Sequence, residues 1–340
     1  MASKGRVLVT GASGYIAGFA IQQLLRDGWS VRGTVRNPAK SAGLHKTLGI
    51  SADQLELVAA DLSHDAGWAD AAKGVDYVLH IASPIPAANP RHDDEIVVPA
   101  REGTLRVLRA ARDAGVKRVV MTSSTAAICY GMDGARQVFT EADWTNPAHP
   151  DTYAYVRSKV IAERAARDFM AREGGTLEFA TINPGAVLGP VLGNDYSASL
   201  EIISKLMNGE LPGLPNFGFA IVDVRDIADA HVRAMTAPDM NGERFLCAGE
   251  FLWMKDIAAI LKDRLGQQAK RVPTRGLPDF VLRLVGKFDK TVGMVLPELG
   301  KARICDASHA KAVLGWVPRP AAESIVDCAN SMIAHGLVKS

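Results

Sequence analysis

Arg6-Val-Leu-Val-Thr-Gly-Ala-Ser-Gly14 is the stretch of sequence that decides the fold of this chain. Its apolar, β-branched first half ends at a glycine, which is typical of a short strand buried in a parallel sheet. Residues 16–27 follow with apolar side chains at helical spacing and stop before Gly28. The stretch therefore predicts a strand, a tight turn and a helix, which is the first unit of an α/β protein.

The alternation of strands and helices continues along the first half of the chain. Further strands are predicted at residues 30–35, 55–59, 77–81, 118–122 and 177–183, with helices that include 103–114 and 155–172. This order predicts a Rossmann-type, doubly wound parallel sheet with helices on both faces. Glycine and proline become frequent after Asn183-Pro184-Gly185, so regular repetition is expected to end there. We expect one domain over residues 1–184, with a strand and helix around 219–237 returning to it, and a smaller region over 185–340.

Composition and charge narrow the class of protein. The chain has 340 residues, of which 48% are hydrophobic and 22% charged, as in an ordinary folded soluble protein. A net charge of +2 gives no field that favours nucleic acid or an anionic membrane, so neither is expected as a partner. The four cysteines are far apart, which favours a reduced chain with no metal site. The sequence shows no secretory segment and no long apolar stretch, so a cytoplasmic protein is expected.

The glycine-rich turn is a candidate phosphate site. Gly11 follows a predicted strand, and Gly14 opens a predicted helix. One glycine permits the tight turn, and the other lets the backbone approach a pyrophosphate at the positive end of the helix. An ordinary strand–helix turn is the alternative. The backbone expected to hold the pyrophosphate is that of Gly11, Ser13, Gly14, Tyr15 and Ile16.

The end of the second predicted strand indicates which dinucleotide would bind. An acidic residue there would accept hydrogen bonds from the ribose 2′-hydroxyl, whereas an arginine would pair with a 2′-phosphate. The sequence has no carboxylate at this place but has Arg36 and Lys40. It therefore favours NADPH over NADH, with a solvated basic loop as the alternative. Arg32 is expected to point toward the surface and is a weaker candidate.

Other positions fall at the same edge of the predicted sheet. We expect the loop after the third strand to face the adenine, and the ends of the fourth and sixth strands to line the cofactor site. His80 is expected to be a packed, hydrogen-bonded residue without a catalytic role. The residues predicted to contact the cofactor in these loops are Asp61, Leu62, Ile81, Ala82, Ser83, Pro184 and Val187.

Tyr155 and Lys159 form the candidate proton donor. A spacing of four residues on a helix places the phenol and the ammonium on one face, so the lysine charge favours ionisation of the phenol. The spacing alone is a weak signal, since it arises by chance in many chains. Tyr153 is a rival phenol, but the residue four positions later is Arg157. Two hydroxyls, Ser123 and Ser124, follow the strand at 118–122 at the same edge.

Together these motifs resemble the extended short-chain dehydrogenase/reductase superfamily, over nearly the whole chain. The branch that reads most similarly contains dihydroflavonol reductases, cinnamoyl-CoA reductases and microbial aldehyde reductases, and it implies NADPH as the cofactor. The resemblance implies that Ser124 polarises a carbonyl oxygen, that Tyr155 protonates it and that Lys159 also holds the nicotinamide ribose. Ser123 is the alternative carbonyl binder. The matching motifs are Gly11-x-x-Gly14-x-x-Ala17, Ser123-Ser124, Tyr155-x-x-x-Lys159, Asn183-Pro184-Gly185 and Gly315-Trp316-Val-Pro318.

Two departures from the branch bear on the substrate. The run Asp151-Thr-Tyr-Ala-Tyr155 differs from the cinnamoyl-CoA reductase pattern, which argues against a CoA thioester. Cys129 stands where dihydroflavonol reductases carry a substrate-reading asparagine, which argues against a flavonoid. The sequence thus predicts reduction of a small aldehyde or ketone by a monomer or homodimer, with a pocket drawn from residues 187–196 and 211–219. An epimerase, a hydroxysteroid-type dehydrogenase and a non-catalytic dinucleotide sensor are the alternatives.

Overall fold

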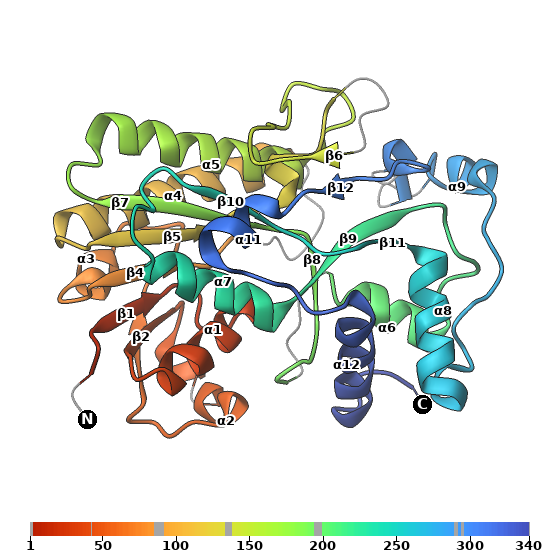
Figure 1. Cartoon of the computed structure of the whole chain (residues 1–340), viewed down its shortest axis with the longest axis horizontal. Helices are drawn as coiled ribbons and strands as arrows, with labels where there is room; N and C mark the ends of the chain where they lie inside the picture. Colours follow the sequence, from red (N-terminus) through yellow and green to blue (C-terminus); the bar gives the residue numbers. More distant parts are fainter. Residues whose placement is uncertain are drawn as a thin grey trace.

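The computed structural model describes residues 3–41, 43–84, 92–132, 138–193, 199–288, 292–293 and 296–339. A seven-stranded sheet and a three-stranded sheet form its framework, with helices packed around them (Figure 1). None of the helices in these ranges is both long enough and apolar enough to cross a bilayer.

The large sheet is parallel throughout, in the order β10-β7-β5-β4-β1-β2-β3. Strand β1 lies in the interior of this order, with Val7 paired to Val31 of β2 on one side and to Tyr77 of β4 on the other. Its strands are short apolar runs, which suits a sheet covered on both faces. Their bounds are β1 Arg6–Val9, β2 Ser30–Val35, β3 Leu55–Ala59, β4 Tyr77–His80, β5 Arg118–Thr122, β7 Glu178–Pro184 and β10 Arg244–Cys247.

Helices cover both faces of the large sheet (Figure 1). On one face α1 (Tyr15–Arg26) packs beside α7 (Val224–Thr236), and on the other α4 (Asp94–Asp113) packs beside α5 (Ala154–Glu173). Helix α3 (Trp68–Ala72) lies against α4. Each face has its own apolar core, so the predicted doubly wound α/β fold is confirmed.

The smaller sheet has the order β11-β9-β8 and a third apolar core. Strand β8 (Ala186–Leu188) pairs parallel with β9 (Gly218–Asp223), and β11 (Phe251–Trp253) pairs antiparallel with β9. Helices α6 (Glu201–Asn208), α8 (Met254–Leu265) and α12 (Ala321–Ala334) contribute to this core. The strand and helix predicted to return to the first domain around 219–237 therefore belong to different layers. Strand β9 is part of the smaller sheet, and of the two only α7 packs on the large one.

The remaining elements are short. They are α2 Leu44–Leu48, α9 Asp279–Val285 and α11 Ser308–Leu314; the strands β6 Val138–Phe139 and β12 Ile304–Cys305, which pair with each other; and the 3₁₀ turns η1 Pro38–Ser41, η2 Thr125–Ala127, η3 Gly266–Ala269 and η4 Leu296–Glu298.

Helix α4 and strand β10 are among the elements that differ from the sequence prediction. Helix α4 begins at Asp94, well before the predicted start at residue 103, and it carries Pro99 inside. Strand β10 was not predicted, although its Phe245 and Leu246 are fully buried at the end of the large sheet. Four residues after a turn give too short an apolar run to separate a strand from a loop.

Candidate active site

The functional side chains gather at one edge of the large sheet. Because its strands are parallel, the segments that follow their carboxyl ends emerge on the same side. The glycine turn follows β1, Arg36 follows β2, Ser83 follows β4 and Ser124 follows β5. The sequence-predicted residues are thus brought to one edge from segments far apart in the chain.

The glycine turn has the shape that a pyrophosphate requires. Gly11 has a φ of 67°, and a Cβ on it would lie 3.0 Å from the Cβ of Ala82. Gly14 caps helix α1 without a side-chain hydrogen bond, so the first amides of the helix remain open to a ligand. Gly33 of β2 lets the turn come close, since a Cβ there would lie 2.7 Å from that of Ala12. These residues fit the pyrophosphate of a dinucleotide.

The other predicted members of this turn differ in their exposure. Ser13 is exposed, whereas Tyr15 and Ile16 are half-buried at the start of α1. The Tyr15 ring lies edge-on to Phe19, and its buried hydroxyl has no hydrogen-bond partner among the residues that the structure describes. Burial raises the pKa of this phenol well above its ordinary value. The backbone of Tyr15, rather than its hydroxyl, is therefore the part suited to a phosphate.

The region after β2 carries positive charge. Arg36 is exposed at the carboxyl edge, close enough to Asp61 to help lower the pKa of that carboxyl, although hydrogen bonds from Ser63 are the larger cause. The side chain of Lys40 lies outside the described residues. The prediction for Arg32 was wrong: its guanidinium is buried, and it donates to the backbone oxygens of Asp70, Ala71 and Lys73 at the end of α3.

A buried histidine supports the backbone after β4. The Thr10 hydroxyl lies 3.0 Å from Nδ1 of His80 and accepts a hydrogen bond from the Ala82 amide. The Thr104 hydroxyl lies 3.4 Å from Nε2 of the same ring. Burial, with a smaller contribution from the charge of Lys159, lowers the pKa of His80 to about 3. His80 is therefore a neutral residue that holds the loop at 81–83.

Lys159 lies at this edge, beside the loop after β4. Its ammonium is buried and donates to the Ser83 hydroxyl at 3.0 Å, and it lies 5.7 Å from the centre of the Tyr155 ring. The small pocket beside it is lined by Leu62, Ala82, Ser83, Pro84, Ala100, Thr104, Met121, Thr122, Lys159 and Ala162. Leu62, Ala82 and Ser83, which the sequence predicts to contact the cofactor, lie beside Lys159 in this pocket.

The two rival tyrosines occupy different environments. Tyr155 is 40% exposed, whereas Tyr153 packs between Tyr155 and Tyr130. The pKa of Tyr153 is raised by burial first and by the neighbouring Tyr155 second. A phenol that resists ionisation is a poor proton donor near neutral pH. Of the two, Tyr155 is therefore the better candidate for a proton donor.

The two serines also differ. The Ser123 hydroxyl is buried and donates to Oε2 of Glu163 at 2.5 Å. Ser124 is half-buried, and its Oγ accepts a hydrogen bond from the Ala126 amide, which leaves its own hydrogen able to point elsewhere. Ser124 is therefore the serine whose hydroxyl hydrogen can reach a ligand.

Three further residues predicted to contact the cofactor are Ile81, Pro184 and Val187. Pro184 is the last residue of β7, and Ile81 is the first residue of the loop after β4. The side chain of Val187 is buried in the core below the large sheet, and its carbonyl accepts a hydrogen bond from Ser199. Val187 can therefore touch a cofactor only through a small exposed part.

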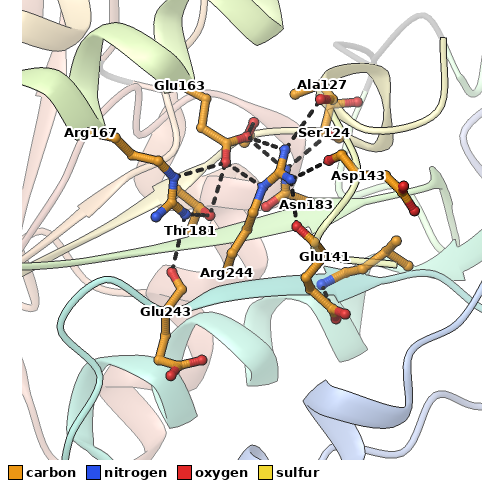
Figure 2. Close-up of polar contacts among 12 residues, drawn as sticks. Ser124, Ala127, Glu141, Asp143, Glu163, Arg167, Thr181, Asn183, Glu243 and Arg244 are labelled. Carbon is orange, nitrogen blue, oxygen red and sulfur yellow. Dashed lines mark hydrogen bonds and ion pairs between the residues drawn. The ribbon is translucent and has the colours of Figure 1, made fainter. Parts of the chain in front are cut away.

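Sequence reasoning missed a group of polar residues behind the serines, shown in Figure 2. Glu163 is bonded to both Asn183 and Arg244, and all three are buried. Each also contacts the turn at residues 123–127, called the serine turn below. One signal was present, because Glu163 follows Lys159 by four residues and so continues the face that carries Tyr155 and Lys159. No comparable signal marks Arg244, which lies in the unpredicted strand β10.

A second pocket lies next to Thr125, beside the smaller sheet. It is lined by Thr125, Cys129, Tyr130, Ala186, Gly218, Phe219, Ala220, Phe251, Arg303 and Cys305. The charge of Arg303 is matched by Glu298, at 2.5 and 2.7 Å, and its guanidinium lies 4.2 Å from the centre of the Tyr130 ring. The lining of this pocket therefore combines apolar and aromatic side chains with polar groups. Among the described residues, no three His, Cys, Asp or Glu side chains gather as a metal site.

Comparisons with known proteins show the family of this chain. The model of the NAD dependent epimerase/dehydratase family matches residues 7–248. Cinnamoyl-CoA reductase 1 of Petunia hybrida is 38% identical over 75% of this chain and 76% of its own length. Dihydroflavonol 4-reductase of Zea mays is 31% identical over 77% of this chain and 74% of its own. The chain therefore belongs to the NAD dependent epimerase/dehydratase family, which is part of the extended short-chain dehydrogenase/reductases.

Solved structures show the same similarity over the full length. The yeast methylglyoxal/isovaleraldehyde reductase Gre2, complexed with NADPH, superposes with a TM-score of 0.81. It is 26% identical, and the match covers 98% of this chain and all of that one. Gre2 of Candida albicans, also in a complex with NADPH, gives a TM-score of 0.80. The resemblance drawn from the sequence motifs is confirmed.

The buried His80 should make stability depend on pH. Its folded pKa of about 3 lies below the ordinary 6.5, so its contribution is present above pH 6.5 and is lost as pH falls toward 3. We expect the wild-type protein to lose up to about 1.4 kcal/mol per pH unit of unfolding free energy relative to His80→Gln in that window. Urea unfolding of both proteins at several pH values measures this. A constant difference between them would contradict it.

Proposed function

We propose that this protein reduces an aldehyde or ketone to an alcohol with NADPH. The observation that carries the proposal is the placement of Ser124, Tyr155 and Lys159 at the edge that also holds the glycine turn. Reductase relatives and neighbours complexed with NADPH support it. At the coarser level of chemistry, the chain is an NAD(P)-dependent oxidoreductase.

Different residues would bind different parts of the cofactor. The glycine turn would hold the pyrophosphate, Arg36 and Lys40 the 2′-phosphate, and Lys159 with Ser83 the nicotinamide ribose. Asp61 and Leu62 would lie at the adenine. NADPH supplies the hydride when bound. This distribution assigns the cofactor to residues 1–184 and the substrate mainly to 185–340.

The chain supplies the proton and the orientation. The Ser124 hydroxyl would donate a hydrogen bond to the carbonyl oxygen, which polarises the carbonyl and fixes its direction. Tyr155 would give its phenolic proton to the same oxygen as negative charge develops there. The ammonium of Lys159 would stabilise the phenolate that remains. Hydride on carbon and proton on oxygen complete the alcohol.

The pocket beside Thr125 supports an uncharged substrate. Its arginine, Arg303, is already paired with Glu298, so it offers little net charge to a carboxylate or phosphate. Phe219 and Phe251 add apolar surface from the smaller sheet. We propose a neutral aldehyde or ketone bound by apolar contact, with a cytoplasmic monomer or homodimer as the working form.

An epimerase or dehydratase is the second candidate, because the matching family model carries that description. Arg36 stands where such enzymes usually hold an acidic residue, and Thr125-Ala126 stands where dehydratases carry an acidic pair. A hydroxysteroid-type dehydrogenase would share the residues above. A screen of NADPH oxidation over aldehydes, keto esters, aryl ketones and steroid ketones separates these candidates. Failure on all of them with tight NADPH binding would favour a sensor.

Replacing Tyr155 tests the proton donor. Tyr155→Phe should lose nearly all reduction, on the order of 100-fold or more in kcat, while NADPH still binds. Tyr153→Phe is the matched control, because it removes a hydroxyl from the neighbouring ring that stacks on Tyr155. It should retain most activity. Steady-state kinetics and NADPH fluorescence titration measure the two effects, and substantial turnover by Tyr155→Phe would exclude the role.

Replacing each serine by alanine should have different effects on kcat and on the free energy of unfolding. Ser124→Ala should lower kcat strongly and change stability little, because the contact of its hydroxyl within the described residues is a local one to the Ala126 amide. Ser123→Ala should cost roughly 1.5–3 kcal/mol of unfolding free energy, because it removes a buried hydrogen bond to a charged acceptor. Kinetics and urea unfolding of both variants give the comparison. Greater loss of kcat in Ser123→Ala than in Ser124→Ala would make Ser123 the carbonyl binder.

Arg36 should govern the choice of cofactor. Loss of a charged hydrogen bond to phosphate is worth about 1.5–3 kcal/mol, so Arg36→Ala should raise the KM for NADPH roughly 10- to 100-fold. The KM for NADH should change little. Arg172→Ala, at the far end of α5, is a control for loss of an exposed arginine. Equal use of NADPH and NADH by the wild-type protein would remove the basis for this assignment.

A further inference from the structure

We propose that Glu163 and Arg244 are positioning residues that fix the catalytic serine turn relative to the helix carrying Tyr155 and Lys159. The inference rests on the proposed reduction, in which Ser124 and Tyr155 act on the same oxygen. It adds to that proposal a buried ion pair that touches no substrate and sets the placement of both groups.

Glu163 sits at the centre of the group. It lies one helical turn beyond Lys159 and two turns beyond Tyr155 on α5, and it is fully buried. Figure 2 shows its carboxylate between the guanidinium groups of Arg167 and Arg244. The Arg244 Nε donates to it at 2.6 Å, whereas the Arg167 Nε is more distant at 3.4 Å.

Arg244 connects this carboxylate to the backbone around the serine turn. From strand β10, its guanidinium donates to the carbonyls of Ala127, Glu141 and Asp143 at 3.2, 2.7 and 2.6 Å. Its guanidinium carbon also lies 3.8 Å from the centre of the Trp144 ring. With these contacts and the ion pair, the guanidinium is held in one orientation.

The serine turn is attached to the ion pair at three points. The Ser123 hydroxyl donates to Glu163, and the Ala127 carbonyl accepts from Arg244. Between them, the Asn183 side-chain amide donates both to the Ser124 carbonyl at 3.2 Å and to Glu163 at 2.8 Å. Both sides of Ser124 are therefore tied to a carboxylate that belongs to the helix of Tyr155.

The arrangement suits positioning better than stability alone. A buried ion pair offers little stability over apolar residues of similar volume, since both charges must lose their water. Its contacts here converge on a turn of five residues, 123–127, whose Ser124 must lie within hydrogen-bond reach of a shared oxygen. A displacement of about 1 Å in such a group can cost on the order of 100-fold in rate.

Arg118 provides a matched control within the same sheet. It is 6% exposed against 7% for Arg244, and it also bonds one glutamate and three backbone carbonyls. It begins β5, whereas the serine turn follows the other end of that strand. Replacing each arginine by lysine keeps the charge and removes the fork of donors. Arg244→Lys and Arg118→Lys therefore differ in which end of the sheet they disturb.

The first measurement is kinetic. Arg244→Lys should lower kcat roughly 10- to 100-fold and leave the KM for NADPH within about twofold, whereas Arg118→Lys should keep both within about twofold. The primary deuterium isotope effect with NADPH labelled at the transferred hydrogen should rise in Arg244→Lys. A general loss of folded protein would not change that effect. Equal losses in both variants, or a lower kcat with an unchanged isotope effect, would overturn the proposal.

The second measurement does not depend on activity. Amide hydrogen exchange of residues 126–129, which bond back to Ser124 and Thr125, should be faster in Arg244→Lys and unchanged in Arg118→Lys. Equal protection in both variants would overturn the positioning role. If the wild-type protein reduces no carbonyl, the proposed function fails, but this exchange still decides whether the ion pair holds the turn.

A third variant keeps the ion pair intact in case Arg244→Lys does not fold. Asn183→Ala removes the link between the Ser124 carbonyl and Glu163 without leaving a charge unpaired. It should lower kcat about tenfold with the same rise in isotope effect and the same faster exchange. Wild-type kinetics and exchange in this variant would count against the proposal.

Discussion

The common direction of the seven strands in the large sheet is the constraint on which the rest of the structure depends. It brings to one edge the glycine turn after β1, the loop after β4 and the serine turn after β5. Segments far apart in the chain thereby meet at one edge. The helices supply what the strands cannot, since Lys159 on α5 reaches across to Ser83 beside β4. Sheet direction gathers the groups, and side-chain contacts set their distances.

Buried arginines recur as the means by which loose backbone is fixed in this fold. Arg32 collects the carbonyls at the end of α3, and Arg118 does the same at the end of α7. Arg244 collects carbonyls from the serine turn and the segment at 141–143. The last carbonyls of a helix lack partners within it, and a guanidinium can satisfy several at once. The same chemistry thus stabilises remote helix ends and the edge that carries the site.

Local patterns in the sequence predict much of the fold, whereas the features that the sequence does not reveal depend on long-range contacts. Alternating apolar strands and helices predict the sheet, and the spacing of Tyr155 and Lys159 predicts their shared face, because both depend on a few neighbouring residues. Arg32 alternates as a surface residue would, yet it is buried because α3 ends above it. Arg244 could not be predicted from the sequence either, because its ion-pair partner, Glu163, lies 81 residues away. Ser123 and Ser124 likewise cannot be told apart from the sequence, because they differ in that Ser123 donates to the buried carboxylate of Glu163.

The path of the chain has a consequence for dividing this protein. The segment β9 passes directly into α7, and the chain returns once more to supply β10 at the border of the large sheet. The larger layer is therefore discontinuous in sequence, and a fragment ending at residue 184 would lack both a covering helix and an outer strand. Exchanging the smaller sheet and its helices between relatives therefore requires several junctions rather than one. Sequence differences between relatives are easier to accommodate in loops and single side chains than by replacement of the whole smaller sheet with its helices.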